Sequence, residues 1–356
     1  MRLGMGAFGT FRANRWFGSL DGLRCISVLG VIFHHALQEH FVGTPLFEAG
    51  KHGVSLFFGI SGFLITTLLL RERERHGTIS LKSFYVRRTL RIFPLYYTII
   101  LAYIGLVLIV EPGSEDATEF FQNLPYYLTY TSNWFVDCPP GERVIFFFAW
   151  SLAAEEQFYL IWPAVEKKLP RFAPWIVLAV VVGVQVARSG LTPLDPDTLA
   201  YSIVTSFAPP IGLGVLLAHL LHSERSFGWV YAWLGDRISS PAALIAVIVA
   251  LALEVPEYVL FPILVLFIGT CVIREDHGLA RVLKLKPLMA AGVVSYGMYL
   301  LHMIAMNVVR RVLGTNVEST PFIYFGLASL CAFAGAWISF NYYEKHFLRF
   351  KKRFER

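Results

Sequence analysis

Residues 93–110, FPLYYTIILAYIGLVLIV, decide the fold class of this chain because they run for 18 positions without a charged residue. A transmembrane helix needs about 20 consecutive apolar residues to cross a hydrocarbon core, and several other runs approach that length. The chain of 356 residues is 56% apolar and 16% charged, whereas a soluble domain carries about 25% charged residues. Inside a bilayer every backbone polar group needs an internal partner, which favours helices. The sequence therefore predicts an all-α polytopic membrane protein.

Apolar runs and turn residues place about ten transmembrane helices along the chain. The predicted ranges are 23–41, 53–70, 93–110, 146–165, 173–187, 199–221, 241–253, 257–273, 288–309 and 322–343. They define an N-terminal segment at 1–22, a transmembrane domain at 23–343 and a basic tail at 344–356. We expect residues 111–145 to form an external loop, which is either a lid or rim for substrate or a solvated connector.

The distribution of basic residues predicts the orientation of the helices. If the N-terminus is cytoplasmic, 26 of the 31 lysines and arginines fall on the cytoplasmic side. The opposite side holds five, namely Lys51, Arg143, Arg188, Arg310 and Arg311. The asymmetry predicts that both termini are cytoplasmic. This orientation and contact with anionic lipid account for the net charge of +6, so we expect no nucleic-acid partner.

The N-terminal segment and the cysteines exclude two other features. Residues 1–22 lack the short apolar region and small-residue cleavage site of a removable signal peptide. The four cysteines form no CxxC or Cys/His spacing, so we predict no metal site.

The first predicted helix is entered through the residues LDGLR at 20–24 and contains two adjacent histidines, His34 and His35. Burying an ionisable group in hydrocarbon is costly, so such residues indicate function. Arg24 and His35 are 11 residues apart, about three helical turns, which places them on one face with a rise of roughly 16 Å. This pattern suits a ligand with an anionic head at the cytoplasmic mouth and a reactive end reaching inward. The alternative is a histidine that only bonds a neighbouring helix.

A second cluster, RRTLRIFP at 87–94, leads into the predicted helix 93–110. On a helix Arg88 and Arg91 project together. Cations at a helix N-terminus oppose its dipole, whereas a bound phosphate would be held by both arginines and by the free N–H groups. The cluster therefore predicts a phosphate site, with topogenic charge that contacts lipid phosphate as the alternative.

A third place is Glu155-Glu156, about ten residues from either end of the helix at 146–165. Two adjacent carboxyl groups cannot both face lipid cheaply, so at least one should be protonated or lie beside a cationic partner in a polar interior. Their depth matches that of His35, which one glutamate could orient; the alternative is a structural ion pair. A weaker element is Tyr299 and His302, which share a face at i, i+3 and which we interpret first as structural hydrogen-bonding residues.

These motifs occur in the order found in the integral-membrane acyltransferase-3 family, which the chain resembles along nearly its whole length. The matching stretches are Arg24 with His35, GVSLFF at 53–58 with ISGFLI at 60–65, RTLRIFP at 88–94, WSL at 150–152 with EEQFY at 155–159, SYGMYLLH at 295–302, and YEK at 343–345. Members of the family move acyl groups, commonly acetyl, onto extracytoplasmic glycans and sometimes onto secondary metabolites. Some carry an additional hydrolase-like domain, whereas this chain resembles the stand-alone form.

The resemblance implies an acyl-CoA donor, acetyl-CoA first, that binds from the cytoplasmic side of a bacterial inner membrane. It implies that His35 is the essential histidine, because only His35 has the matching spacing from Arg24. The adjacent His34 is the alternative. Arg24, Arg88 and Arg91 would serve the anionic donor. The acceptor would be a hydroxyl of a carbohydrate or glycolipid.

Two chemical routes and one other function class stay open. His35, oriented by Glu155 or Glu156, would deprotonate the acceptor hydroxyl for direct attack on the thioester, or the acyl group would pass through a transient acyl-histidine. A proton-coupled transporter would use the same histidine and glutamates as a proton relay. Inverted repeats or paired broken helices would support a transporter, and the sequence shows neither.

Overall fold

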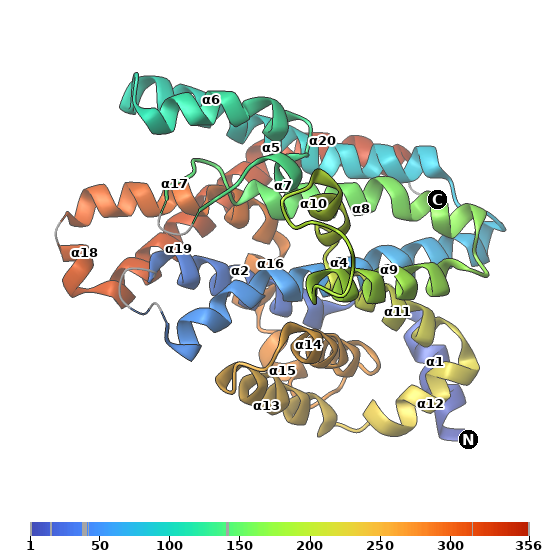
Figure 1. Ribbon diagram of the computed structural model, residues 1–356. Coiled ribbons are helices and arrows are strands. Elements are labelled where there is room, and N and C mark those ends of the chain that lie inside the picture. The colour runs from blue at the N-terminus through green and yellow to red at the C-terminus, as the bar shows by residue number, and fades with distance from the viewer. Residues whose placement is uncertain are drawn as a thin grey trace. The chain divides into compact units, whose positions relative to one another are not determined.

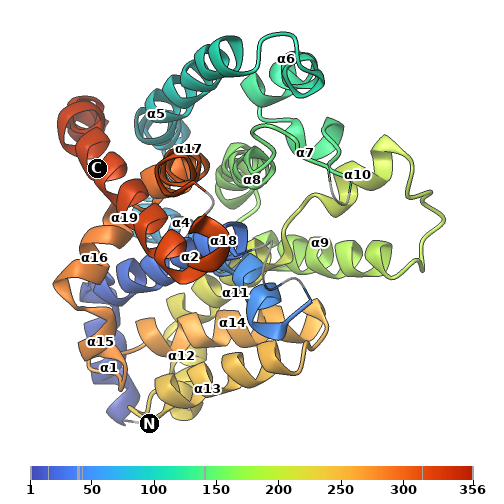
Figure 2. The same cartoon turned by 90° about the vertical axis from the view of Figure 1, so that its left-hand side faces the viewer.

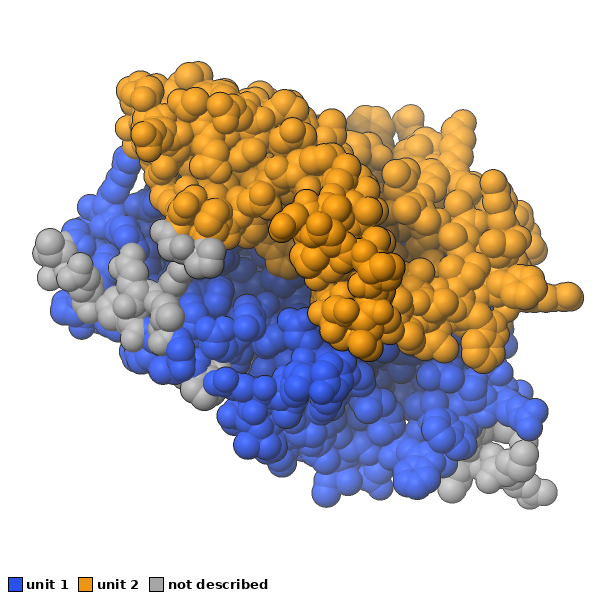
Figure 3. Space-filling view, in the orientation of Figure 1, with its two compact units in different colours: residues 1–71, 209–343 blue, residues 72–208, 344–356 orange. Residues whose placement is uncertain are grey.

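The computed structural model describes residues 2–14, 16–37, 41, 43–139, 142–314 and 316–354, and these residues form helices and turns with no β-strand among them (Figure 1). The predicted all-α fold is confirmed. The chain divides into two compact units, which Figure 3 shows in different colours. Unit 1 comprises residues 1–71 and 209–343, and unit 2 comprises residues 72–208 and 344–356.

Unit 1 gathers helices from the N-terminal fifth and the C-terminal part of the sequence around α2 (Gly18–Ala36). Its other helices are α1 (Arg2–Ala13), α4 (Pro45–His76, whose last residues belong to unit 2), α11 (Pro209–His222), α12 (Glu224–Leu234), α13 (Ser239–Ala252), α14 (Glu257–Val272), α15 (Ala280–Leu283), α16 (Lys286–Val293), α17 (Ser295–Leu313), α18 (Asn316–Ser319) and α19 (Pro321–Ser339). Helix α2 packs against α16, α17 and α19, and α13 packs against α14 (Figure 2).

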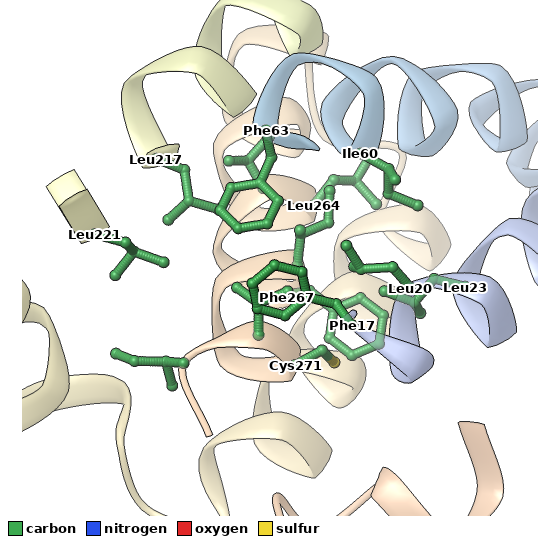
Figure 4. Packing of buried hydrophobic residues seen from close by; sticks show 14 of the residues in the cluster. Phe17, Leu20, Leu23, Ile60, Phe63, Leu217, Leu221, Leu264, Phe267 and Cys271 are labelled. Atoms are coloured by element: carbon green, nitrogen blue, oxygen red, sulfur yellow. The ribbon is translucent and has the colours of Figure 1, made fainter. Parts of the chain in front are cut away.

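The core of unit 1 lies where α2 meets α4 and α14 (Figure 4). Leu20 and Leu23 of α2 are buried there, and the ring of Phe17 meets the ring of Phe63 edge-on with the centroids 5.6 Å apart. Between membrane helices such close van der Waals packing provides much of the stabilisation, because lipid tails are as apolar as the side chains. The packing fixes the first turn of α2, which precedes Arg24.

Unit 2 is built around α5 (Leu81–Val110), which contacts α6 (Glu115–Leu128), α8 (Ala149–Lys168), α20 (Lys345–Lys351) and the 3₁₀ helix at Lys352–Phe354. The remaining helices are α7 (Ser132–Phe135), α9 (Ala173–Arg188) and α10 (Leu199–Thr205). Helix α5 begins at Leu81 because the Ser80 hydroxyl accepts a hydrogen bond from the N–H of Ser83 at 3.3 Å, which caps the first turn. The Glu72 carboxylate accepts a further hydrogen bond from the N–H of Ser80 at 2.8 Å.

Four helical segments are long and apolar enough to cross a membrane, and the number rises to seven if each of three bent helix pairs is one span. Large apolar side chains lie on the surface of such segments: Leu101 of α5 is 67% exposed and Leu330 of α19 is 65% exposed. A soluble protein rarely exposes so much apolar surface, whereas lipid covers it without cost. The chain is therefore a membrane protein. Ten crossings and cytoplasmic termini stay predictions, as do the three predicted parts at 1–22, 23–343 and 344–356.

Each of the ten predicted ranges contains helix, but the predicted start of the helix at residue 93 is wrong. Helix α5 starts at Leu81 and continues through Pro94. Proline removes one backbone hydrogen bond and is tolerated in transmembrane helices because neighbouring groups satisfy the freed carbonyl. The predicted single helix 199–221 consists of α10 and α11, separated at residues 206–208. The predicted single helix 288–309 is also wrong, because it consists of α16 and α17, which are bent by 79° relative to each other. Residues 38–40 at the end of the first predicted helix and residues 355–356 of the predicted tail lie outside the described residues.

The prediction of a loop at residues 111–145 is also wrong for much of its length, since the segment contains α6 and α7. The Ser114 hydroxyl accepts a hydrogen bond from the N–H of Ala117 at 3.1 Å and caps α6. The acidic residues in its first turn interact favourably with the positive end of the helix dipole. The segment is held to α5, where the buried Tyr96 hydroxyl donates to the Tyr127 carbonyl oxygen at 2.8 Å.

Candidate active site

Helix α2 of unit 1 carries Arg24, His34 and His35, as the sequence predicts. Arg24 lies in the second turn and pairs with the Asp21 carboxylate, with 3.4 Å between the charged atoms. The indole N–H of Trp16 donates to the other oxygen of the same carboxylate at 2.8 Å. Asp21 is buried and sits in the first turn of the helix, where a negative charge is favoured by the helix dipole. Arg24 is therefore held at the start of the helix that ends with the two histidines.

The start of α2 is fixed by two close backbone approaches. A Cβ atom on Gly22 would lie 2.2 Å from the carbonyl oxygen of Leu283, and one on Gly292 would lie 1.8 Å from the carbonyl oxygen of Asp21. Only glycine leaves room for backbone at these distances, as in the small-residue contacts of membrane helices. Helix α2 thus sits against α15 and α16 by main-chain contact, and any side chain at either glycine would move it.

His35 lies beside two residues of α17 that the sequence predicted only as support. The centroids of the His35 and His302 rings are 5.1 Å apart, and those of His302 and Tyr299 are 5.4 Å apart. His302 is completely buried, and its Nδ1 donates a hydrogen bond to the carbonyl oxygen of Tyr299, which can only accept. This bond orients the imidazole and, when His302 is neutral, leaves Nε2 as an acceptor. Unit 1 therefore brings the candidate base and both support residues together.

His34 has a different environment from its neighbour. Its Nδ1 lies 3.2 Å from the carbonyl oxygen of Phe47, and its ring stacks on the Phe47 ring with the centroids 4.3 Å apart. Phe47 thus occupies both Nδ1 and one ring face of His34. The environment of His34 therefore favours His35 as the reactive histidine of the pair.

The arginines of unit 2 lie inside α5, which corrects the predicted phosphate site at a helix N-terminus. Because the helix begins at Leu81, the N–H groups of Arg88 and Arg91 are in helix interior and are not the free donors of a first turn. The side chains can still bind an anion, but the proposed help from the helix terminus is lost. The Arg88 guanidinium lies over the ring of Tyr159, 4.3 Å from its centroid.

Arg87, the neighbour of Arg88, serves the structure of the turn before α5. Its guanidinium pairs with the Glu72 carboxylate at 3.1 Å and donates to the carbonyl oxygen of Phe354 at 2.7 Å. These bonds tie the end of α4 and the C-terminal segment to α5. Two adjacent arginines in one motif therefore have different surroundings.

The two glutamates lie in the second turn of α8, in the same unit as Arg88. The Tyr159 hydroxyl donates a hydrogen bond to the Glu155 carboxylate. Glu156 interacts electrostatically with Arg88 and with Tyr96. The cationic partner expected for the pair is thus Arg88, which the sequence had placed in a separate cluster.

The hypothesis that one glutamate orients His35 joins groups of two different units, and it stays a prediction. So do the assigned roles of the arginines in donor binding.

Helix α7 and the residues just before it are held to α8 by side chains that the sequence analysis does not single out. The side-chain amides of Gln157 and Asn133 bond each other in both directions, at 3.0 and 2.9 Å, and Gln157 also donates to the Tyr130 carbonyl oxygen at 2.8 Å. Further out, hydrogen bonds and charges from Glu111 and Asp116 raise the pKa of Arg143, which pairs with both. The sequence offers one indication of the contact with Asn133: Gln157 stands two residues after Glu155, in the same EEQFY stretch.

The part of the chain that the structure describes contains no group of three or more His, Cys, Asp or Glu side chains placed to hold a metal ion.

Comparison with known proteins assigns the chain to a family. The sequence pattern of the acyltransferase-3 family, described as an acyltransferase domain, matches residues 17–340. The chain belongs to the acyltransferase-3 family. The matched range contains every candidate residue of both units, so the resemblance drawn from the ordered motifs is confirmed.

Two curated relatives carry names that state an activity. The peptidoglycan O-acetyltransferase OatA of Listeria monocytogenes is 28% identical over 321 residues, which cover 82% of this chain and 49% of the relative. The O-acetyltransferase OatA of Staphylococcus aureus is 29% identical over 319 residues, which cover 81% of this chain and 50% of the relative. The chain spans about half the length of these relatives. No solved structure matches it.

Proposed function

We propose that this chain is a membrane O-acyltransferase that moves an acyl group, acetyl first, from cytoplasmic acyl-CoA to a hydroxyl of an extracytoplasmic glycan or glycolipid. The observation that carries the proposal is the placement of His35 beside His302 and Tyr299 in a chain of the acyltransferase-3 family. The names of the relatives favour acetyl as the group and peptidoglycan as the first acceptor to test. Lipid-linked sugars, surface polysaccharides and secondary metabolites are the other acceptors.

In the proposed reaction His35 acts as the general base. Its free imidazole nitrogen takes the proton of the acceptor hydroxyl as the oxygen attacks the carbonyl carbon of the thioester. The new ester bond forms, the carbon–sulfur bond breaks, and the proton passes to the CoA sulfur, which leaves as a thiol. Tyr299 and His302 support the imidazole or the substrate, and either Glu155 or Glu156 orients or polarises the base.

The basic residues would bind the donor. CoA carries several phosphate charges, which Arg24, Arg88 and Arg91 would meet from the cytoplasmic side. The predicted excess of lysine and arginine on that side would raise the local concentration of an anionic donor. Both termini would then be cytoplasmic, in a multi-pass protein of the bacterial inner membrane.

A transient acyl-histidine is the second route to the same product. There a nitrogen of His35 bonds to the thioester carbon, the carbon–sulfur bond breaks, and CoA leaves as the thiol with the proton of the imidazole. In a second step the acceptor oxygen attacks the acyl carbon, the carbon–nitrogen bond breaks, and the hydroxyl proton returns to the imidazole. Incubation with labelled acetyl-CoA in the absence of acceptor distinguishes the routes. Labelled wild-type protein, with none from His35→Ala, supports the relay, and the absence of label from active protein supports direct transfer.

The deciding experiment uses the full chain reconstituted in proteoliposomes with acetyl-CoA. Peptidoglycan fragments, a lipid-linked sugar and a soluble polysaccharide are added in turn, and CoA release is measured together with acetylation of each acceptor by mass spectrometry. We expect CoA release that depends on acceptor and on His35. No CoA release with any acceptor would overturn the proposal.

A further inference from the structure

Tyr159 of α8 makes two different contacts with residues of the candidate site in unit 2. Its hydroxyl donates a hydrogen bond to the Glu155 carboxylate, one helical turn earlier. The face of its ring lies under the Arg88 guanidinium, with 4.3 Å between the guanidinium carbon and the ring centroid. The side chain is 4% exposed, so both contacts are made away from bulk solvent. One side chain therefore touches both the proposed donor-binding arginine and a candidate catalytic glutamate.

The two contacts restrict their partners in different ways. A guanidinium over an aromatic face is attracted to the ring electrons and is held nearly parallel to the ring, which leaves its N–H edges free to point outward. A hydroxyl that donates to a carboxylate fixes the rotation of the carboxylate. Tyr159 is thus suited to set the orientation of Arg88 and Glu155 together.

A second tyrosine in the same pair of helices provides a matched comparison. The Tyr85 hydroxyl of α5 donates to the Leu160 carbonyl oxygen of α8 at 2.7 Å. This bond joins α5 to α8, as the contact of Tyr159 with Arg88 does, but its acceptor is main chain. The Tyr159 hydroxyl bonds within α8, whereas the Tyr85 hydroxyl bonds from α5 to α8. If the only role of these tyrosines is to hold the two helices together, loss of the Tyr159 hydroxyl should therefore have no larger consequence than loss of the Tyr85 hydroxyl.

We propose that Tyr159 is a positioning residue of the acyl-transfer site: its ring orients Arg88 toward the anionic donor, and its hydroxyl orients Glu155. The inference rests on the proposed function, because it assigns the arginine to donor binding and the glutamate to the chemical step. Within that function the hydroxyl of Tyr159 affects the chemical step and its ring affects donor binding, and different substitutions test the two.

The test measures kcat and the KM for acetyl-CoA in proteoliposomes for three variants. Tyr159→Phe keeps the ring and removes the hydroxyl, so kcat falls about tenfold or more while KM stays within about twofold. Tyr159→Leu removes the ring as well, so KM also rises severalfold. Tyr85→Phe, the matched control, leaves both constants within about twofold. Thermal melting of each variant in detergent records any loss of fold.

A double-mutant cycle with Glu155→Gln tests whether the hydroxyl acts through that glutamate. If it does, adding Tyr159→Phe to Glu155→Gln lowers kcat no further, because the interaction is already lost. Independent, multiplicative losses would overturn the inference, as would a Tyr159→Phe variant whose kcat equals that of Tyr85→Phe. Each of these results requires active wild-type protein. A wild-type protein that releases no CoA with any acceptor contradicts the proposed function itself, and the inference falls with it.

Discussion

In unit 1 the helix that carries His35 is held where backbone meets backbone, whereas in unit 2 the residues around Arg88 are held by the ends of long side chains. Gly22 and Gly292 let α2 touch α15 and α16 directly. Arg88, Tyr159 and Glu155 instead form a chain of one ring contact and one hydrogen bond. A backbone contact permits little adjustment, so substitution at these glycines should destabilise the fold. A set of linked side chains can lose one contact and keep the fold, so substitution of Arg88, Tyr159 or Glu155 should lower activity.

The largest expected effect is the loss of activity on substitution of His35, which lies in α2 of unit 1. His35→Ala removes the proposed base and should lower kcat about 10²- to 10⁴-fold, the usual contribution of a general base. His34→Ala removes a hydrogen bond to Phe47 and a stacked ring, so it should lower the melting temperature and leave most of the activity. CoA release and thermal melting on the same preparations check both. An inactive His34→Ala beside an active His35→Ala would exchange the roles of the two residues.

The second prediction tests whether backbone contact holds α2. Gly292→Ala places a methyl group 1.8 Å from the Asp21 carbonyl oxygen, so the helices must separate at a cost of about 3 kcal/mol or more. Gly326→Ala in α19 is the matched control, because a Cβ there meets nothing within 4 Å. It should be neutral or stabilise the helix by about 0.5–1 kcal/mol. Melting temperatures in detergent measure both, and equal melting of the two variants would contradict the backbone clamp.

How much of this arrangement could be predicted from sequence follows from how local each feature is. The common helix of Arg24 and His35 is a matter of periodicity within one element, so their spacing predicted it. The approach of His302 to His35 depends on the packing of α2 against α17, residues far apart in the chain, and no local pattern encodes it. The start of α5 was missed although Ser80 is a recognisable cap, because Pro94 resembles a first helical residue and outweighed it.

The same reasoning applies to the side chains of unit 2. Tyr159 stands four residues after Glu155, so their hydrogen bond was accessible to a helical wheel. That Arg88 supplies the cation for this group was not, because it requires the contact between α5 and α8. That the separate motifs belong to one activity stays a prediction, and it comes from their order along the chain, which resembles that of the family.

The third prediction separates the two adjacent arginines of α5. Arg88→Lys replaces a planar cation by a point charge that cannot stack on the Tyr159 ring in the same way, so the KM for acetyl-CoA should rise about tenfold, which corresponds to about 1.4 kcal/mol, with the fold intact. Arg87→Lys weakens the bonds to Glu72 and Phe354, so stability should fall by about 1 kcal/mol with KM unchanged. Kinetics and melting curves check this. Equal KM effects would mean that Arg88 has no specific contact with the donor. They would favour the alternative from the sequence analysis, in which the arginines are topogenic charges that contact lipid phosphate.

The last prediction concerns a side-chain clamp in unit 1 that supplements the backbone contacts. Between α14 and α15, His277 lies 2.8 Å from the Ser19 hydroxyl of α2 and 3.1 Å from the Ser240 hydroxyl of α13. Burial, and then the charge of Lys284, lower the pKa of His277 to about 4. The native clamp is thus neutral, whereas an unfolded chain takes up the proton near pH 6.5. Stability contributed by the neutral form should be full above pH 6.5 and should decline toward pH 4, by at most about 1.4 kcal/mol per pH unit for one proton.

His277→Gln keeps hydrogen-bonding groups and does not titrate, so melting temperatures measured from pH 7.5 to 4.5 should fall less steeply for this variant than for wild type. Parallel slopes would show that the titration of His277 does not contribute to the stability of unit 1.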